Sequence, residues 1–197
     1  GNGNGSCTGN GQYVSSQNDG PIVIKNNQLT NSNIDISQGY GYCVQGNVVT
    51  NGGITIGGSS DQSIPANHIV KNNQVTGHGG TGFAIQGDGN TVEGNTANSN
   101  ESGFTFTQGA KNNIITNNVA NNNQRYGFLF TSDDLSGTGH TFTGNTASGN
   151  SLGDFEGITI SNVDLYFKEN RIEPQPSGTT VFSVGNTFLY LYTDVGN

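Results

Sequence analysis

Short apolar clusters recur along this chain at a spacing typical of a repeat solenoid. Seven segments align on an asparagine that directly follows such a cluster: Asn27, Asn47, Asn73, Asn95, Asn118, Asn145 and Asn170. Successive members are 20, 26, 22, 23, 27 and 25 residues apart, so the mean spacing, (170 − 27)/6, is about 24 residues. A recurring spacing of this length predicts stacked coils, each burying its apolar face against its neighbours.

Two short strands are expected in each coil. The first directly precedes the aligned asparagine, at 22–24, 42–44, 68–70, 91–92, 114–115, 141–143 and 165–167. The second follows some 7 to 13 residues later, at 34–36, 54–56, 83–85, 104–106, 128–130, 158–160 and 181–183. Alternation with a period of two turns every second side chain inward. Stacking then forms two internal columns, Phe83, Phe104 and Phe128 in one and Ile85, Phe106 and Phe130 in the other.

The aligned asparagines are interpreted as structural residues rather than catalytic ones. Asparagine tolerates the left-handed backbone conformation that a sharp corner between two strands needs. Stacked asparagine amides can also hydrogen-bond to one another along the solenoid axis. We therefore expect an asparagine ladder from Asn27 to Asn170.

No helical stripe of useful length is present, and glycine interrupts every candidate window. The fold class is therefore predicted as all-β, a parallel β-helix of about seven coils over 21–197. An irregular amino-terminal arm or cap is expected at 1–20, which is rich in Gly, Asn, Ser and Gln. The β-forming run at 188–192 is expected to belong to an eighth, unfinished turn.

The local pattern resembles the right-handed parallel β-helix superfamily, the pectate-lyase-like fold with asparagine-rich repeats. Its elements are a strand, then Gly-Asn or Asn-Asn, then Thr, Ala or Val, and then Gly-Phe or Gly-Ile before the next strand. The resemblance covers roughly residues 20–192 and implies a right-handed solenoid. Superfamily members include polysaccharide lyases, hydrolases, alginate epimerases, tailspikes, adhesins and copper-site accessory proteins, so the fold alone does not select a function.

Composition excludes two classes of partner. The formal net charge is −8, from 14 acidic and 6 basic side chains, which leaves little Lys or Arg for nucleic-acid phosphates or an anionic membrane surface. No run approaches the roughly 18 apolar residues of a membrane span. The chain starts at Gly1 rather than Met, which suggests a processed or trimmed product.

The two cysteines bear on localisation. Cys7 and Cys43 could form one disulfide that ties the amino-terminal arm to the second coil, and the alternative is a pair of buried free thiols. Few charges, abundant Asn, Gly and Thr, and a possible disulfide favour an extracellular or cell-surface location.

One column of solvent loops, between the aligned asparagine and the second strand, carries candidate chemistry: His78, Glu101, Arg125 with Tyr126, and Asp154 with Glu156. In a lyase or epimerase, a basic residue abstracts the proton beside a sugar carboxylate while a cation neutralises that carboxylate. Arg125 flanked by Glu101 and Asp154 is the best such constellation, with Glu156 as a further catalytic candidate. Arg125 and Tyr126 are also the candidate glycan-binding residues.

A second column, after the second strand, carries Asp88, Lys111, Asp133 and Asp134. Asp133 and Asp134 are candidate Ca²⁺ ligands, and no other cofactor is expected. Solvated charges that neutralise one another are the preferred explanation of both columns, because acidic and basic residues on neighbouring solvent loops often lie close together by chance. His68 and His140 each precede a strand, which predicts an edge or turn position, and the Asp-Pro-His-Asp signature of alginate epimerases is absent.

The ends of a solenoid need a cover, because a bare end exposes strand edges and an apolar cross-section. Our leading hypothesis is a non-catalytic extracellular structural subunit that stacks end to end into a filament, with adhesion to polysaccharide as a further role. The arm then either completes the last coil of a neighbour or folds back as a lid held by a cysteine pair. The alternative is a carbohydrate-active β-helix, either a polysaccharide lyase or epimerase or a glycan-binding domain.

Overall fold

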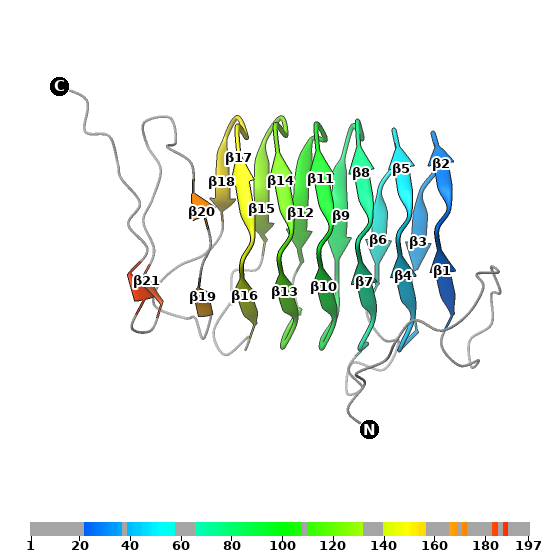
Figure 1. Cartoon of the computed structure of the whole chain (residues 1–197), viewed down its shortest axis with the longest axis horizontal. Coiled ribbons are helices and arrows are strands. Elements are labelled where there is room, and N and C mark those ends of the chain that lie inside the picture. Colours follow the sequence, from blue (N-terminus) through cyan, green and yellow to red (C-terminus); the bar gives the residue numbers. More distant parts are fainter. Residues whose placement is uncertain are drawn as a thin grey trace.

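Three parallel sheets wind into one solenoid in the computed structural model of the chain (Figure 1). The structure describes residues 22–36, 39–57, 66–107, 110–131 and 140–156, and the backbone of four short strands between 166 and 188. In this described part every regular element is a strand. The predicted all-β parallel solenoid is therefore confirmed.

Each coil passes through the three sheets in the same order. Sheet A contains β1 (Val23–Lys25), β4 (Cys43–Gln45), β7 (Ile69–Lys71), β10 (Thr91–Glu93), β13 (Ile114–Thr116), β16 (Thr141–Thr143) and β19 (Tyr166–Lys168). Sheet B contains β2 (Gln28–Thr30), β5 (Val48–Thr50), β8 (Gln74–Thr76), β11 (Thr96–Asn98), β14 (Val119–Asn121), β17 (Thr146–Ser148) and β20 (Arg171–Ile172). Sheet C contains β3 (Ile34–Ile36), β6 (Ile54–Ile56), β9 (Thr81–Ile85), β12 (Ser102–Phe106), β15 (Tyr126–Phe130) and β18 (Gly153–Glu156).

The predicted number of about seven coils is slightly high for complete coils. Among the described residues six coils contribute to all three sheets, and a seventh contributes only β19 and β20. In coil 6 the sheet C strand is β18, earlier than the predicted 158–160, which lies outside the described residues. Of the predicted strand at 181–183 only Ser183 is described; it lies in β21 (Ser183–Val184), which pairs antiparallel with β22 (Thr187–Phe188) in a separate sheet and not with sheet C.

The phenylalanine columns occur as predicted. Phe83, Phe104 and Phe128 are paired in register along sheet C, and their rings stack with centroids 4.7 and 4.9 Å apart. Phe155 continues this stack at 5.3 Å. In the second column, Phe106 and Phe130 stack at 4.7 Å after Ile85. Offset or stacked rings at this spacing stabilise the core beyond the area they bury.

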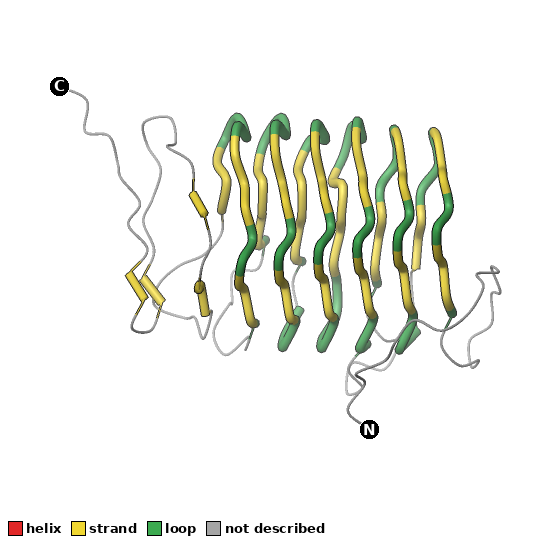
Figure 2. The backbone as a smooth tube through the Cα atoms, in the orientation of Figure 1, coloured by secondary structure: helices red, strands yellow, loops and turns green. Residues whose placement is uncertain are grey.

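Sequence reasoning missed sheet B. Each of its strands has three residues or fewer. Those of coils 1 to 6 turn a single side chain inward, which becomes small in the later coils, as at Ala97, Ala120 and Ala147. One alanine between polar residues has no period-two signal. Figure 2 shows that these strands follow directly after the strands of sheet A, separated only by a short corner.

The left-handed residue at that corner precedes the aligned asparagine, which corrects the predicted position by one. The corner column alternates strictly between asparagine and glycine: Asn26, Gly46, Asn72, Gly94, Asn117 and Gly144, all with φ between 54° and 66°. A Cβ placed on Gly94 would lie 2.5 Å from Oδ1 of Asn72. Each corner asparagine therefore folds its side chain over the glycine of the next coil.

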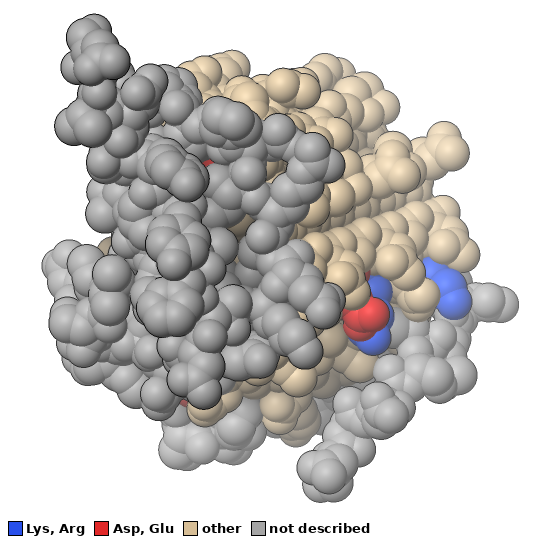
Figure 3. All heavy atoms as spheres, turned by 60° about the vertical axis from the view of Figure 1, so that its left-hand side comes forward, with Lys and Arg blue, Asp and Glu red and all other residues tan. Residues whose placement is uncertain are grey.

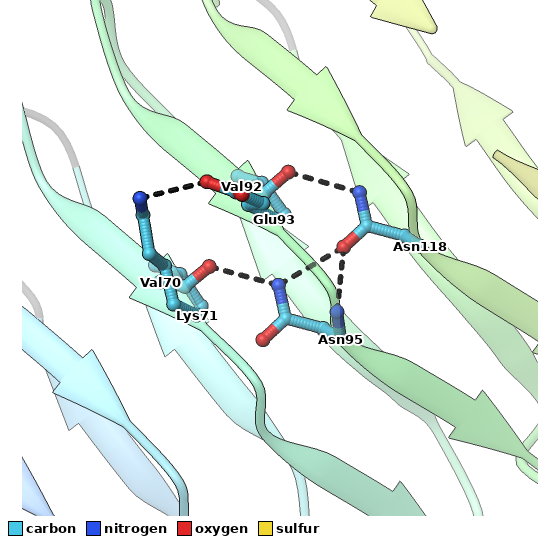
Figure 4. Close-up of polar contacts among 6 residues, drawn as sticks. All are labelled: Val70, Lys71, Val92, Glu93, Asn95 and Asn118. Atoms are coloured by element: carbon cyan, nitrogen blue, oxygen red, sulfur yellow. Dashed lines mark hydrogen bonds and ion pairs between the residues drawn. The ribbon is translucent and has the colours of Figure 1, made fainter. Parts of the chain in front are cut away.

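The aligned asparagines form the expected ladder, here called the A–B ladder: Asn27, Asn47, Asn73, Asn95, Asn118 and Asn145. Figure 4 shows that Asn95 donates from Nδ2 to Oδ1 of Asn118 at 3.0 Å and to the carbonyl of Val70 at 2.8 Å. Its backbone N–H also donates to Asn118 Oδ1 at 2.9 Å. Oδ1 of Asn95 accepts both equivalent hydrogens from Asn73 at 2.9 Å. The ladder is therefore directional, and Asn170, its predicted last member, lies outside the described residues.

Candidate functional site

His78, Glu101 and Arg125 lie on consecutive coils at the corner between sheets B and C. The backbone N–H of Glu101 donates to the carbonyl of His78 at 2.9 Å, and that of Arg125 donates to the carbonyl of Glu101 at 2.7 Å. The Arg125 guanidinium lies 3.4 Å from the Glu101 carboxylate and 5.6 Å from the centre of the Tyr126 ring. The structure thus brings this part of the predicted column together. We call the side chains of Glu101, Arg125 and Tyr126 the corner patch.

Asp154 does not join the corner patch. It is 1% exposed, and its Oδ1 accepts a hydrogen bond from Nδ2 of Asn150 at 2.6 Å inside the solenoid. Glu156 is exposed and lies opposite Leu129 on the outer face of sheet C. The constellation of Arg125 between Glu101 and Asp154 that a lyase or epimerase would need is therefore not formed.

Asp154 instead ends a second ladder, the B–C ladder, which sequence reasoning missed. Its members are Asn100, Asn123 and Asn150, each five residues after an aligned asparagine. Asparagine every five residues, as in 90, 95 and 100, was the available signal. Because Asn100 is fully buried, the sequon formed by Asn100, Glu101 and Ser102 is not accessible to a glycosylating enzyme in the folded protein.

A third ladder, the C–A ladder, contains two histidines in place of asparagine. The backbone N–H of Tyr42 donates to Nδ1 of His68 at 3.1 Å, and that of Asn113 donates to Nδ1 of His140 at 3.1 Å. Asn90 links them, since it accepts from His68 and donates to Asn113. Both histidines lie at a corner, in agreement with the predicted edge or turn position, but their side chains are buried.

Burial gives these histidines unusual acid–base properties. Desolvation lowers the pKa of His68 and of His140 to about 4, against a weaker opposing effect of neighbouring backbone groups. Because Nδ1 accepts a hydrogen bond, the neutral ring carries its proton on Nε2, and in both residues Nε2 makes no hydrogen bond to the part of the chain that the structure describes. Neither imidazole reaches solvent, so both are structural groups rather than candidate general bases.

No metal site is found among the described residues. In this part of the chain, no three His, Cys, Asp or Glu side chains lie close enough together to hold an ion. In the second loop column, the Asp88 carboxylate accepts a hydrogen bond from the backbone N–H of Lys111 at 2.9 Å. Asp133 and Asp134 lie outside the described residues, so their proposed Ca²⁺ role stays a prediction.

Cys43 is 4% exposed and disulfide-bonded. Cys7 lies outside the described residues, so the predicted pairing of the two stays a proposal. None of the described residues belongs to a helix that is long and apolar enough to cross a bilayer.

Charges are scarce on the outer faces of sheets A and B. In coils 1 to 6 their outward positions carry only Lys25, Lys71 and Glu93, and the last two pair at 2.7 Å. On the face drawn in Figure 3 the described residues are mostly uncharged, with a few basic and acidic side chains close to one another. These faces offer neutral hydroxyl, amide and β-branched side chains in rows along the axis.

Coil 1 presents a different kind of surface, because β1, β2 and β3 are the terminal strands of their sheets. Ile24 and Leu29 are only partly buried there, whereas their neighbours in coil 2, Val44 and Val49, are fully buried. The described edge of coil 1 therefore combines three strand edges with an incompletely covered apolar centre.

Comparison with known proteins agrees with this architecture. A family model described as "Right handed beta helix region" matches residues 10–172. No curated protein matches the chain. Among solved structures, trypsin-treated QnrB1, described as a plasmid-mediated fluoroquinolone resistance protein, is 13% identical over 77% of this chain and 91% of that chain, with a TM-score of 0.21. That similarity is too low to bear on fold or function here.

Proposed function

The chain belongs to the family of right-handed β-helix regions, and we propose that within it this protein is a non-catalytic extracellular structural subunit that stacks end to end. The observation that carries the proposal is the edge of coil 1, where, among the described residues, three sheets stop at strands that have a neighbour on one side only. Exposed strand edges of this kind pair readily with another chain. Stacking would continue all three sheets and cover Ile24 and Leu29.

The arrangement of charged groups supports a non-catalytic role. Arg125 is paired with Glu101, and Asp154 is committed to the B–C ladder, so the acid, base and cation of a lyase do not converge. The disulfide at Cys43 supports an oxidising, extracellular compartment. The uncharged faces of sheets A and B would suit adhesion to a neutral surface, which is the adhesive part of the proposal.

Self-association is tested by electron microscopy and light scattering of the purified chain over a range of concentrations. Filaments, or a mass that grows with concentration, are expected. A constant monomer mass at the highest accessible concentration would exclude the proposed function.

A second candidate function is glycan binding at the corner patch. It is favoured by the position of the Arg125 guanidinium over the Tyr126 ring, next to Leu152, which is 58% exposed. An aromatic ring and a planar cation side by side suit the faces and hydroxyls of a sugar. Binding and turnover of uronic-acid polysaccharides, with and without Ca²⁺, test this function. Binding that Arg125→Ala abolishes would support a glycan-binding domain, and turnover lost in the same variant would instead support the enzyme.

A further inference from the structure

The outer face of sheet B has no charged side chain in coils 1 to 6. Each strand turns its middle residue inward and its first and third residues outward, so the outward side chains form two columns along the axis. Because the strands are paired in register, neighbouring members of a column lie about 4.8 Å apart. The column of third residues contains Thr30, Thr50, Thr76, Asn98, Asn121 and Ser148.

The two halves of this column differ in how their polar groups are used. In coils 4 to 6 the side chains are bonded along the axis. Oδ1 of Asn98 accepts a hydrogen bond from the backbone N–H of Asn121 at 3.0 Å, and the hydroxyl of Ser148 donates to Oδ1 of Asn121 at 3.0 Å. In coils 1 to 3 the three threonine hydroxyls make no hydrogen bond to the described residues. They are therefore available to a ligand.

Coils 1 to 3 also expose this surface more fully. The outward residues of β2 and β8 are exposed and Val48 in β5 is 37% exposed, whereas the outward residues of β11, β14 and β17 are only partly exposed. Hydroxyl and amide groups each offer both a donor and an acceptor. We call the six outward side chains of coils 1 to 3 the neutral face: Gln28, Thr30, Val48, Thr50, Gln74 and Thr76.

We propose that the neutral face binds a neutral polysaccharide that lies along the solenoid axis. This inference rests on the adhesive part of the proposed function and names its surface and its partner. The net charge of −8 disfavours an acidic polymer, and the neutral face has no carboxylate to attract a basic one. A neutral polysaccharide repeats hydroxyl donors and acceptors along its chain, so successive sugars can bond to the side chains of successive coils.

A protein partner fits the neutral face less well. Protein interfaces are anchored by a few large aromatic or apolar side chains in a desolvated centre, and Val48 is the only apolar member of this face. The unpaired edge of β2 points along the axis and not out of the neutral face, so strand addition does not use this surface. Polar groups spread evenly over three coils instead fit a ligand that is polar throughout its length.

Binding is tested with the purified chain against cellulose, chitin, xylan and mannan, with polygalacturonate as the acidic counterpart. The valine variant removes the three free hydroxyls and keeps the β-branched shape that suits a strand: Thr30→Val, Thr50→Val and Thr76→Val. The matched control removes three partly exposed hydroxyls from the outer face of sheet A: Thr91→Val, Thr116→Val and Thr143→Val. A serine variant at positions 30, 50 and 76 keeps the hydroxyls and removes only the methyl groups. Circular dichroism establishes that each variant is folded.

Wild type should bind at least one of the neutral polysaccharides more tightly than polygalacturonate. In the valine variant the dissociation constant should rise at least about tenfold, because three hydrogen-bonding groups are lost, while the control and the serine variant should bind like wild type. Binding to none of the neutral polysaccharides, a preference for polygalacturonate, or equal binding by the valine variant would overturn the inference. An equal loss in the control or in the serine variant would also overturn it, because the hydroxyls of the neutral face would then not decide binding. If the valine variant does not fold, Gln28→Ala with Gln74→Ala replaces it.

Light scattering of the same samples separates this inference from the stacked subunit. The neutral face lies on the side of the solenoid, so the valine variant should associate with itself like wild type. Self-association of wild type without binding to a neutral polysaccharide would overturn the inference and leave the stacked subunit standing. Binding by a chain that stays a monomer, with the expected loss in the valine variant, would support the neutral face and overturn the stacking.

Discussion

The A–B ladder and the C–A ladder lie at two inner corners of this solenoid, and both provide hydrogen-bond acceptors for the preceding coil, but with different side chains. In the A–B ladder every described member from Asn47 to Asn145 is a buried asparagine, and its amide oxygen accepts hydrogens from the coil before it. In the C–A ladder the acceptor is a histidine ring nitrogen at His68 and at His140. Both corners thus satisfy a backbone N–H of the preceding coil.

The difference lies in what happens to the rest of the side chain. The amide of Asn95 uses both Nδ2 hydrogens and its oxygen in hydrogen bonds, so it has no unsatisfied group and no protonation equilibrium in the accessible pH range. In the imidazole of His140, Nε2 makes no hydrogen bond to the described residues, and Nδ1 no longer accepts a hydrogen bond once the ring is protonated. We therefore expect the A–B ladder to stabilise the fold at every pH, and the C–A ladder to stabilise it only above a threshold pH.

The largest effect is expected from breaking the A–B ladder. Asn95→Ala would leave the two donors of Asn73 and the carbonyl of Val70 without their partner in a dry interior, and Oδ1 of Asn118 would keep only the backbone N–H of residue 95. At about 1–3 kcal/mol for each buried group left unpaired, the free energy of unfolding should fall by about 5 kcal/mol. Urea unfolding followed by circular dichroism measures it, and a loss below about 1 kcal/mol would show that the ladder is dispensable.

The next effect is a loss of stability in acid that arises from the C–A ladder. The pKa of His68 and of His140 is about 4 in the folded chain and about 6.5 when unfolded, so the unfolded state binds more protons between these values. Their contribution is complete above pH 6.5 and is lost as the pH falls towards 4, by about 2 kcal/mol for each histidine at pH 5. Unfolding free energies measured at pH 7.5 and 5 test this.

The matched variants separate this effect from the titration of surface carboxylates. His68→Asn with His140→Asn restores the residue used elsewhere in the ladders and should flatten the pH dependence between 6.5 and 4. His78→Asn, at the partly exposed corner between sheets B and C, is the matched control for a histidine replaced outside the C–A ladder. An equal acid loss in wild type and in the double variant would refute the assignment.

A smaller effect is expected at the corner that precedes the A–B ladder. Gly94 has φ of 65° and would bring an added Cβ within 2.5 Å of Asn72 Oδ1, so Gly94→Ala should cost about 2 kcal/mol, as left-handed strain plus a clash. With Asn72→Gly in the same chain the clash disappears, and the cost of Gly94→Ala should fall to about 1 kcal/mol. A double-mutant cycle by urea unfolding measures the coupling, and a coupling of zero would contradict the alternating corner.

The smallest effect is expected outside the ladders. The ion pair of Lys71 and Glu93 is partly exposed, so Lys71→Ala should change the free energy of unfolding by less than about 1 kcal/mol, and less still at high salt. Thermal unfolding at low and high ionic strength measures it. A loss as large as that of Asn95→Ala would show that surface charge, and not the inner corner, holds the coils in register.

The phenylalanine columns and the A–B ladder could be predicted because their signals are local and strong. Phe83, Phe104 and Phe128 recur once per coil with a glycine directly before each, and a wrong register would turn all of them to water. Asn95 follows a strand in the same way as its equivalents. These features depend only on the order of residues within one coil.

Other features could not be predicted because they depend on which residue meets which across coils. The left-handed corner residue and the ladder residue are adjacent, as in Asn117 and Asn118, and both can be asparagine, so composition alone does not separate their roles. The sequence around His140 predicts an edge or turn residue, and only the structure shows that its Nδ1 takes the place of an amide oxygen. Asp154 looked like a catalytic partner of Arg125 because alternation in a short strand does not reveal that its side chain turns inward.

The central claim is that the end of coil 1 is an open end of the solenoid that a further copy completes. Sedimentation velocity of the purified chain over a hundredfold range of concentration tests it most directly. The weight-average mass should rise continuously and pass the mass of a dimer without a plateau. A mass that stays at one chain throughout would contradict the account.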